Sequence, residues 1–295
     1  MRALALYLLA VFAGGALLAP WLYHAVRALA ESVPALESVA RMPFARYVNR
    51  ALMLTALVGL PWYVRAAGIR TWRDAGIPPG GIRWKAFGTS FALGFASLAA
   101  VCLVALAAGG RELKPRSPGE LAGQFLGVLA TALVVAVIEE LLFRGAIFGG
   151  LRRAMRWPAA LALGSAVYAI VHFMGRPANP PQVDWLSGLR VLPTMLAGMT
   201  EARTLVPAFL SLTLAGVILG LAYQWTGDLS ASIGIHAGWI FWLKFYGFAT
   251  AAVEGADTWF WGTRKLVDGW LAFVALVVVL GAVLLLMRRR RIPAS

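Results

Sequence analysis

Segments of about 20 mainly apolar residues recur along the whole chain, and this pattern constrains the fold more than any other feature. A helix of that length crosses the hydrocarbon core of a bilayer with its backbone hydrogen bonds made internally. The expected spans are 3–25, 51–67, 86–108, the apolar run 121–151, 158–174, 205–225, 229–248 and 266–287. The sequence therefore predicts an all-α, polytopic membrane protein with about eight transmembrane helices.

Composition supports the same class. Hydrophobic residues make up 60% of the chain and charged residues only 14%, whereas about a quarter of the residues in a soluble domain are charged. The net charge is +14, and the basic residues cluster between the apolar runs. This placement favours contact with membrane lipid headgroups, and no groove or stacking platform for nucleic acid is indicated.

Basic clusters also predict the orientation. If the N-terminus is cytoplasmic, the clusters at 70–85, 152–156 and 288–291 all lie on the cytoplasmic side, together with the C-terminus. The Ala/Gly/Arg-rich composition favours a bacterial inner membrane. The first span follows only Arg2, so it is either a retained helix or a signal peptide cleaved near 28–30.

The chain is expected to have three parts. Residues 1–120 hold the first three spans and an amphipathic connection at 26–49, residues 121–250 hold the expected catalytic core, and residues 251–295 hold the last span and a basic tail. The single cysteine, Cys102, excludes an intramolecular disulfide and a cysteine-based metal cluster.

Two adjacent carboxylates and an arginine interrupt the apolar run 121–151: Glu139, Glu140 and Arg144. Ionisable groups at this depth are costly, which makes them a functional-site hypothesis. Glu140 and Arg144 have the i,i+4 spacing of a helical ion pair, which alone could merely fix helix packing. Neighbouring helical residues point about 100° apart, so Glu139 is expected to face a different target in the bundle interior.

Two histidines lie in later apolar segments, His172 near the end of the fifth span and His236 in the seventh. A lone membrane histidine is often only an interhelical hydrogen-bond partner, but with Glu139 and Glu140 the two form a plausible water-activating set around an intramembrane cavity. Glu139 and the histidines could activate water directly, or the three could bind zinc with an open position for water. The spacing does not choose between these mechanisms.

Three motifs together resemble the CPBP family of intramembrane proteases, which includes the CAAX proteases. They are Glu139-Glu140-x-x-x-Arg144, the stretch from Tyr168 to His172, and the stretch from Thr226-Gly227-Asp228 to His236. The resemblance implies that Glu139 and His172 activate water, that His236 stabilises the oxyanion, and that Glu140 and Arg144 hold the site. It also implies a membrane-associated protein or peptide substrate.

This sequence departs from the family pattern at two positions. Tyr168 stands where the family usually has Phe, and Ile240 stands where it usually has Asn, four residues after the motif's histidine. Ile240 cannot donate a hydrogen bond, and loss of one oxyanion donor costs other enzymes about 10²–10³ in rate. Lys244, one turn further along, is a candidate substitute.

The leading hypothesis is an intramembrane endopeptidase that hydrolyses a peptide bond near the membrane with Glu/His-activated water. The alternative suggested by Ile240 is a catalytically weak or inactive scaffold or immunity protein of the same fold. A transporter with a Glu/His proton relay would be expected to have internal repeats, and the sequence contains none that we can detect.

Overall fold

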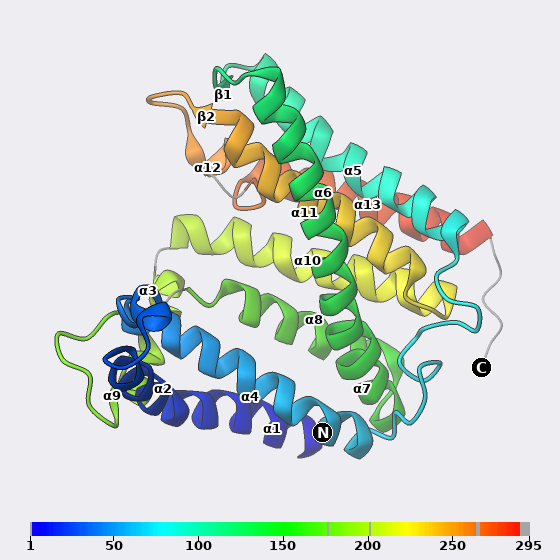
Figure 1. Ribbon diagram of the computed structural model, residues 1–295. Helices are drawn as coiled ribbons and strands as arrows, with labels where there is room; N and C mark the ends of the chain where they lie inside the picture. Colours follow the sequence, from blue (N-terminus) through cyan, green and yellow to red (C-terminus); the bar gives the residue numbers. More distant parts are fainter. Residues whose placement is uncertain (1, 176, 201, 264–265, 290–295) are drawn as a thin grey trace. The chain divides into compact units, whose positions relative to one another are not determined.

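The computed structural model describes residues 2–175, 177–200, 202–263 and 266–289, and these are mainly helical (Figure 1). The predicted all-α membrane fold is confirmed. The chain forms two compact units, Met1–Gly68 with Phe173–Thr200 and Ile69–His172 with Glu201–Ser295. The expected division at residues 120 and 250 follows the order of the spans along the chain and stays a prediction.

The first unit is a pair of long helical segments with short helices at one end. Its elements are α1 (Arg2–Leu9), the π-helix η1 (Ala10–Gly14), α2 (Gly15–Ala30), η2 (Pro34–Leu36), α3 (Glu37–Ala40), α4 (Phe44–Ala66), α9 (Ser187–Val191) and η4 (Pro193–Thr200). Helix α2 packs against α4, where a Cβ on Gly15 would lie 2.8 Å from the Leu52 backbone. The rings of Tyr7 and Tyr63 stack across the same pair of segments at 4.9 Å.

The second unit contains the longer helices. They are α5 (Trp84–Ala107), α6 (Pro118–Glu140), the π-helix η3 (Leu141–Phe148), α7 (Gly149–Ala154), α8 (Trp157–Phe173, whose last residue belongs to the first unit), α10 (Ala202–Thr226), α11 (Ser230–Ala249), α12 (Thr258–Trp261) and α13 (Trp270–Arg289). Strands β1 (Arg111–Leu113) and β2 (Thr250–Ala252) form an antiparallel pair with Glu112 opposite Ala251. This small sheet lies where the sequence suggested only connecting loops.

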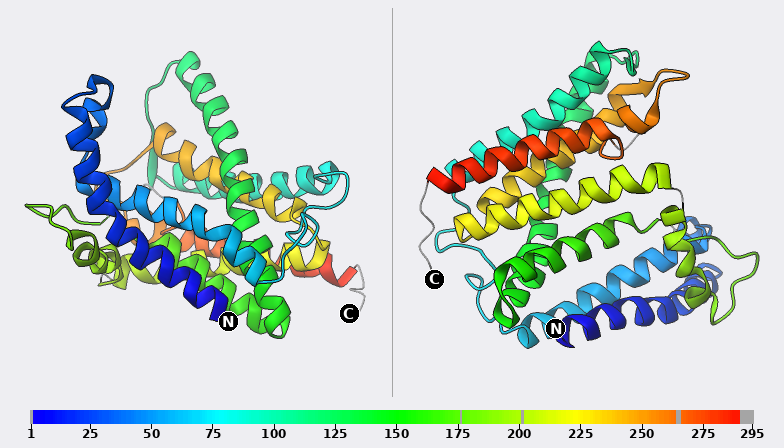
Figure 2. Two further views of the ribbon diagram at one scale, coloured as in Figure 1. Left: turned by 60° about the horizontal axis from the view of Figure 1, so that its bottom comes forward. Right: turned by 180° about the vertical axis from the view of Figure 1, so that it is seen from behind.

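Helix α11 lies at the centre of the second unit, in contact with α5, α6 and α10 (Figures 1 and 2). Every residue from Ser230 to Phe241 is buried. Helix α5 approaches it closely because the contact positions are glycines: a Cβ on Gly94 would lie 2.3 Å from the Ile235 carbonyl oxygen, and one on Gly238 would lie 2.4 Å from the Phe95 nitrogen. Small residues permit this kind of close helix packing in membranes.

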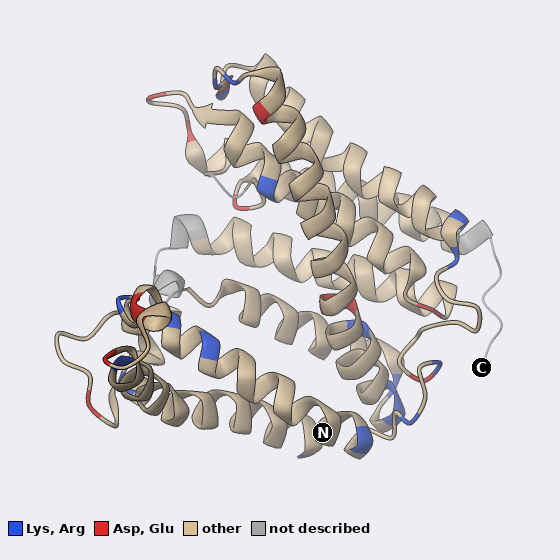
Figure 3. Cartoon of the chain, in the orientation of Figure 1, with Lys and Arg blue, Asp and Glu red and all other residues tan. Residues whose placement is uncertain are grey.

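Five helical segments among the described residues are long and apolar enough to cross a membrane: Arg2–Ala30, Trp84–Ala107, Pro118–Ala154, Leu205–Thr226 and Trp270–Met287. The other three expected spans correspond to helices α4, α8 and α11. Helix α4 begins at Phe44, earlier than the predicted start at 51, because the end of the amphipathic stretch is helical. Charged residues gather mainly at helix ends and in loops (Figure 3).

Candidate active site

The two glutamates are the last residues of α6, where the chain passes directly into the π-helix η3. Such π-turns are rare and are frequent at functional sites. Six of the eight residues of η3 are buried, from Phe143 to Phe148. A Cβ on Gly145 would lie 2.5 Å from the Ala75 carbonyl oxygen, so glycine there lets the preceding loop pack against the π-helix.

Glu140 forms the ion pair that its spacing to Arg144 suggests. Nη1 of Arg144 donates to Oε1 of Glu140 at 2.8 Å, and both side chains are almost completely buried. Nη2 of Arg144 donates to the Gly216 carbonyl oxygen of α10 at 3.4 Å, and the guanidinium lies 4.4 Å from the centre of the Tyr168 ring. The pair therefore links the end of α6 to α8 and α10.

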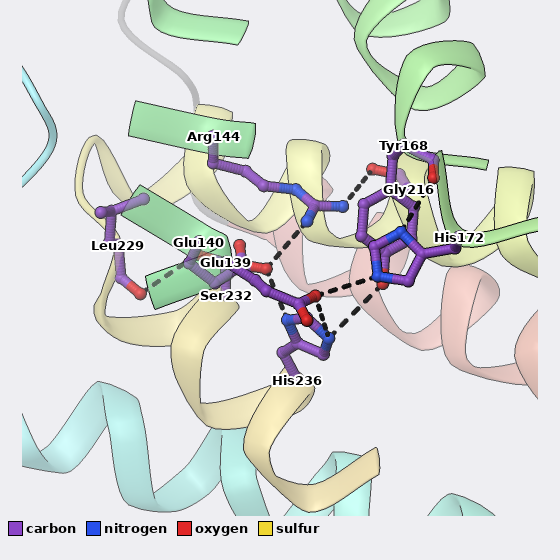
Figure 4. Close-up of polar contacts among 9 residues, drawn as sticks. All are labelled: Glu139, Glu140, Arg144, Tyr168, His172, Gly216, Leu229, Ser232 and His236. Carbon is purple, nitrogen blue, oxygen red and sulfur yellow. Dashed lines mark hydrogen bonds and ion pairs between the residues drawn. The ribbon is translucent and has the colours of Figure 1, made fainter. Parts of the chain in front are cut away.

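The His236 ring contacts the carboxylates of both glutamates (Figure 4). Its Nδ1 lies 2.7 Å from Oε1 of Glu140, and its Nε2 lies 3.6 Å from Oε2 of Glu139. The nearest partners of the two carboxylates differ, as expected, because Glu140 pairs with Arg144 and Glu139 with His172, but both carboxylates also contact His236. The angle between neighbouring side chains is accommodated because the imidazole ring lies between them and presents one nitrogen to each.

His172 completes the group from the end of α8. Its Nε2 lies 3.0 Å from Oε2 of Glu139, and its Nδ1 lies 2.9 Å from the Tyr168 carbonyl oxygen. His172 lies near the end of the fifth predicted span, and Glu139 contacts both histidines. Tyr168 lies beside both rings: its own ring is 4.0 Å from that of His172, and its hydroxyl is 3.4 Å from Nε2 of His236.

The hydrogen-bond partners assign the protons of the two histidines. The Tyr168 carbonyl can only accept, so Nδ1 of His172 carries a proton. The 3.0 Å contact between its Nε2 and Glu139 then requires one further proton, which the two groups share. Glu140 is ionised beside Arg144 and can only accept, so Nδ1 of His236 also carries a proton.

Exposure distinguishes two sides of this cluster. The side chains of Glu139 and His172 are 27% and 25% exposed, whereas those of Glu140 and His236 are 0% and 5% exposed. A water molecule or substrate therefore reaches the Glu139–His172 pair first. The Glu140–Arg144 pair lies behind it and holds His236.

Lys244, which the sequence suggested as a substitute donor, and His24, the third histidine of the sequence, are not members of this cluster. Lys244 is exposed and lies two turns beyond His236 on α11, a rise of about 12 Å, so this candidate substitute does not join the site. His24 is in the first unit, where its ring lies 4.9 Å from that of Trp185. Ile240 is buried on α11, one turn after His236.

Gly216 is the contributor that sequence reasoning did not single out. Its carbonyl accepts from Arg144, and a Cβ there would lie 3.0 Å from Ser165 of α8. Gly220, one turn later, also faces α8, where a Cβ would lie 2.3 Å from the Leu161 side chain. Two small residues four apart in an apolar helix are the signal of close packing that could have indicated this contact.

A metal site is not supported by the donor arrangement. Among the described residues, no group of three His, Cys, Asp or Glu side chains has the arrangement of a metal site. Glu139, His172 and His236 therefore do not form such a group either. We therefore derive no chemical step through zinc. A cavity of about 580 Å³ lies within the first unit, between the end of α2, the start of α4 and residues 179–183, and none of the predicted site residues lines it.

The fold and the buried Glu/His cluster define a polytopic helical membrane protein with a polar site buried among its helices. Residues 121–242 match the family model described as Rce1-like, type II CAAX prenyl endopeptidase. This matched domain includes Glu139, His172 and His236, and the match confirms the family resemblance expected from the motifs. Comparison with curated proteins and comparison with solved structures each found no match.

Proposed function

We propose that this protein is an intramembrane endopeptidase that hydrolyses a peptide bond of a membrane-associated substrate with Glu139-activated water. The observation that carries the proposal is the contact of Glu139 with both His172 and His236, on the accessible side of a buried polar cluster. The Rce1-like domain supports protease activity at the level of the family.

The shared proton gives the Glu139–His172 pair both functions that hydrolysis needs. Glu139, as carboxylate, takes a proton from water while the water oxygen bonds to the carbonyl carbon. Protonated His172 then gives its Nε2 proton to the leaving nitrogen as the C–N bond breaks. The proton held by Glu139 returns to His172 across their 3.0 Å contact, which restores the starting state.

Glu140 and Arg144 are proposed to hold the site rather than to react. Their charges cancel within the pair, and the shared proton leaves Glu139 and His172 together neutral. A neutral cluster avoids much of the cost of placing charge inside a membrane. The carbonyl oxygen that becomes negative is proposed to face the side of the cluster on which His236 lies.

The proposed location is a bacterial inner membrane, with the C-terminus in the cytoplasm and contact with membrane lipid. The basic clusters between the apolar segments support this orientation, because basic residues are enriched in cytoplasmic loops. The substrate segment is proposed to be a C-terminal region of a membrane-associated protein, in line with the family model.

Proteomics of protein C-termini tests the activity. Cells that produce the wild-type chain are compared with cells that produce Glu139→Gln, His172→Ala or the control Lys244→Ala. We expect shortened C-termini with the wild type and Lys244→Ala, and a loss of about 10²–10⁴-fold in processing rate with the two site variants. Processing that is unchanged in Glu139→Gln would reject the proposal. A cellular phenotype that survives both site variants would instead support a non-catalytic scaffold.

A further inference from the structure

Nε2 of His236 faces the reacting side of the site without a proton of its own. Nδ1 of this ring donates to the Glu140 carboxylate at 2.7 Å, and a neutral imidazole carries only one N–H. Glu140 is already paired with Arg144, so its charge is not free to stabilise an imidazolium. Oε2 of Glu139 also faces Nε2, at 3.6 Å, but it makes the shorter 3.0 Å contact with Nε2 of His172, with which it shares a proton. Nε2 is therefore a hydrogen-bond acceptor in the resting site, and it cannot donate to an oxyanion.

The hydroxyl of Tyr168 is the donor next to that nitrogen. It lies 3.4 Å from Nε2 of His236, beyond the usual length of an O–H···N bond, so this contact holds it only weakly. The Tyr168 ring is fixed from two sides, by the His172 ring at 4.0 Å and by the Arg144 guanidinium at 4.4 Å. The ring position is thus set while the O–H can rotate toward a new acceptor.

We propose that the Tyr168 hydroxyl donates the hydrogen bond that stabilises the oxyanion, with His236 as its resting acceptor. This assignment rests on the proposed endopeptidase function and deepens it. When water attacks the carbonyl carbon, the oxygen becomes negative and is a stronger acceptor than the neutral Nε2. The O–H then turns from His236 to the oxyanion, and no proton leaves Tyr168 at any step.

The position of Ile240 fits this assignment. Ile240 follows His236 by one helical turn on the buried face of α11, and its side chain offers no hydrogen bond. The Tyr168 hydroxyl, on α8, is therefore a hydrogen-bond donor beside His236 where the side chain at position 240 of α11 provides none. An asparagine at 240 would place an amide donor one turn from His236, which makes a rescue experiment possible.

The test compares Tyr168→Phe with the wild type. The substrate peptide is the segment found shortened by C-terminal proteomics in cells carrying the wild type, and the full chain is purified in detergent. Tyr168→Phe keeps the ring contacts and removes only the hydroxyl. We expect kcat to fall by about 10²–10³-fold with KM little changed, because the bond forms only as the oxyanion develops.

Two variants serve as controls. Tyr246→Phe makes the same chemical change at a fully buried tyrosine of α11, whose hydroxyl has no hydrogen-bond partner within the described part of the chain, so kcat should be unchanged. Ile240→Asn, introduced into Tyr168→Phe, should recover at least about tenfold of the lost kcat, since one donor replaces another. Thermal unfolding of each variant checks that it folds.

The outcomes separate the two proposals. If Glu139→Gln abolishes processing and Tyr168→Phe keeps wild-type kcat, the Tyr168 assignment is wrong and the endopeptidase proposal stands. Equal losses in kcat with Tyr168→Phe and Tyr246→Phe would also overturn the assignment, because they would reflect loss of a buried hydroxyl in general. If Glu139→Gln processes normally, or wild-type cells yield no shortened C-termini, both proposals fail.

Discussion

Oε1 of Glu140 accepts a hydrogen bond of 2.7 Å from Nδ1 of His236, which lies 96 positions later in the chain. The same oxygen accepts from Arg144, so one buried atom fixes both the cation on its own helix and the imidazole on α11. A charged pair of this kind contributes little net stability when intact, but loss of one partner leaves the other charge buried and uncompensated.

Glu140→Gln should therefore destabilise the protein by about 3–5 kcal/mol, because Arg144 keeps its charge and loses its counterion. Thermal unfolding in detergent measures the effect. Glu139→Gln is the matched control, since that side chain is 27% exposed and is expected to alter stability much less. Similar losses in both variants would show that the Glu140–Arg144 pair does not hold the structure together in this way.

Close packing of α5 against α11 gives a second prediction. Gly94→Ala would place a Cβ 2.3 Å from the Ile235 carbonyl oxygen, next to His236, and should cost about 1–3 kcal/mol and reduce processing. Gly88→Ala on the same helix is the control, because a Cβ there has no atom within 4 Å. Unfolding temperature and processing rate are measured for both, and equal behaviour would contradict the packing argument.

The sequence was sufficient to predict the helical class, the family and the residues that converge. Apolar length and the rarity of buried charge are local signals, so Glu139, Glu140, His172 and His236 could be recognised without coordinates. Which atoms meet depends on helix rotation and on the π-helix after Glu140, and neither has a clear local signal. For that reason the shared contact of both glutamates with His236 could not be predicted.

Direct water activation and zinc catalysis differ in their response to metal removal. Because no described group of three donors has the arrangement of a metal site, we expect processing by the purified protein to continue after dialysis against a strong chelator. Residual activity and bound metal are measured on the same sample. If activity is lost on dialysis and is restored when Zn²⁺ is added, that result would contradict the direct mechanism and favour the zinc alternative.

Lys244 offers a simple check on the boundary of the site. It lies about 12 Å of helix rise beyond His236 and is exposed, so it is too far along α11 to replace the missing amide at position 240. Lys244→Ala should process substrate at the wild-type rate. The double variant of Lys244→Ala and Tyr168→Phe should have the same kcat as Tyr168→Phe alone. A fall in kcat of tenfold or more would place Lys244 at the site after all.

Asp74 orders the loop before α5 and links it to α7, and the neighbouring Gly76 links the same loop to the start of α11. Its carboxylate accepts from the Thr71 and Arg70 backbone nitrogens and pairs with Arg153 at 2.9 Å, while the Gly76 carbonyl accepts from Leu229 at 2.9 Å. Hydrogen bonds from the Arg70 backbone and from Thr71 lower the pKa of Asp74 below its ordinary value of 3.8. The stability it contributes is thus present above that value and is lost as the pH falls through the folded-state pKa.

Asp74→Asn should therefore unfold at a lower temperature than the wild type at about pH 7, and the difference should shrink as the pH is lowered below the ordinary pKa of the carboxyl group. The change is expected to be small because the loop is partly exposed, so salt and solvent weaken the ion pair. Unfolding temperatures of both proteins across this pH range provide the measurement. A difference that stays constant with pH would mean that the ionised carboxylate is not what holds the loop, and that the shape of the side chain alone matters.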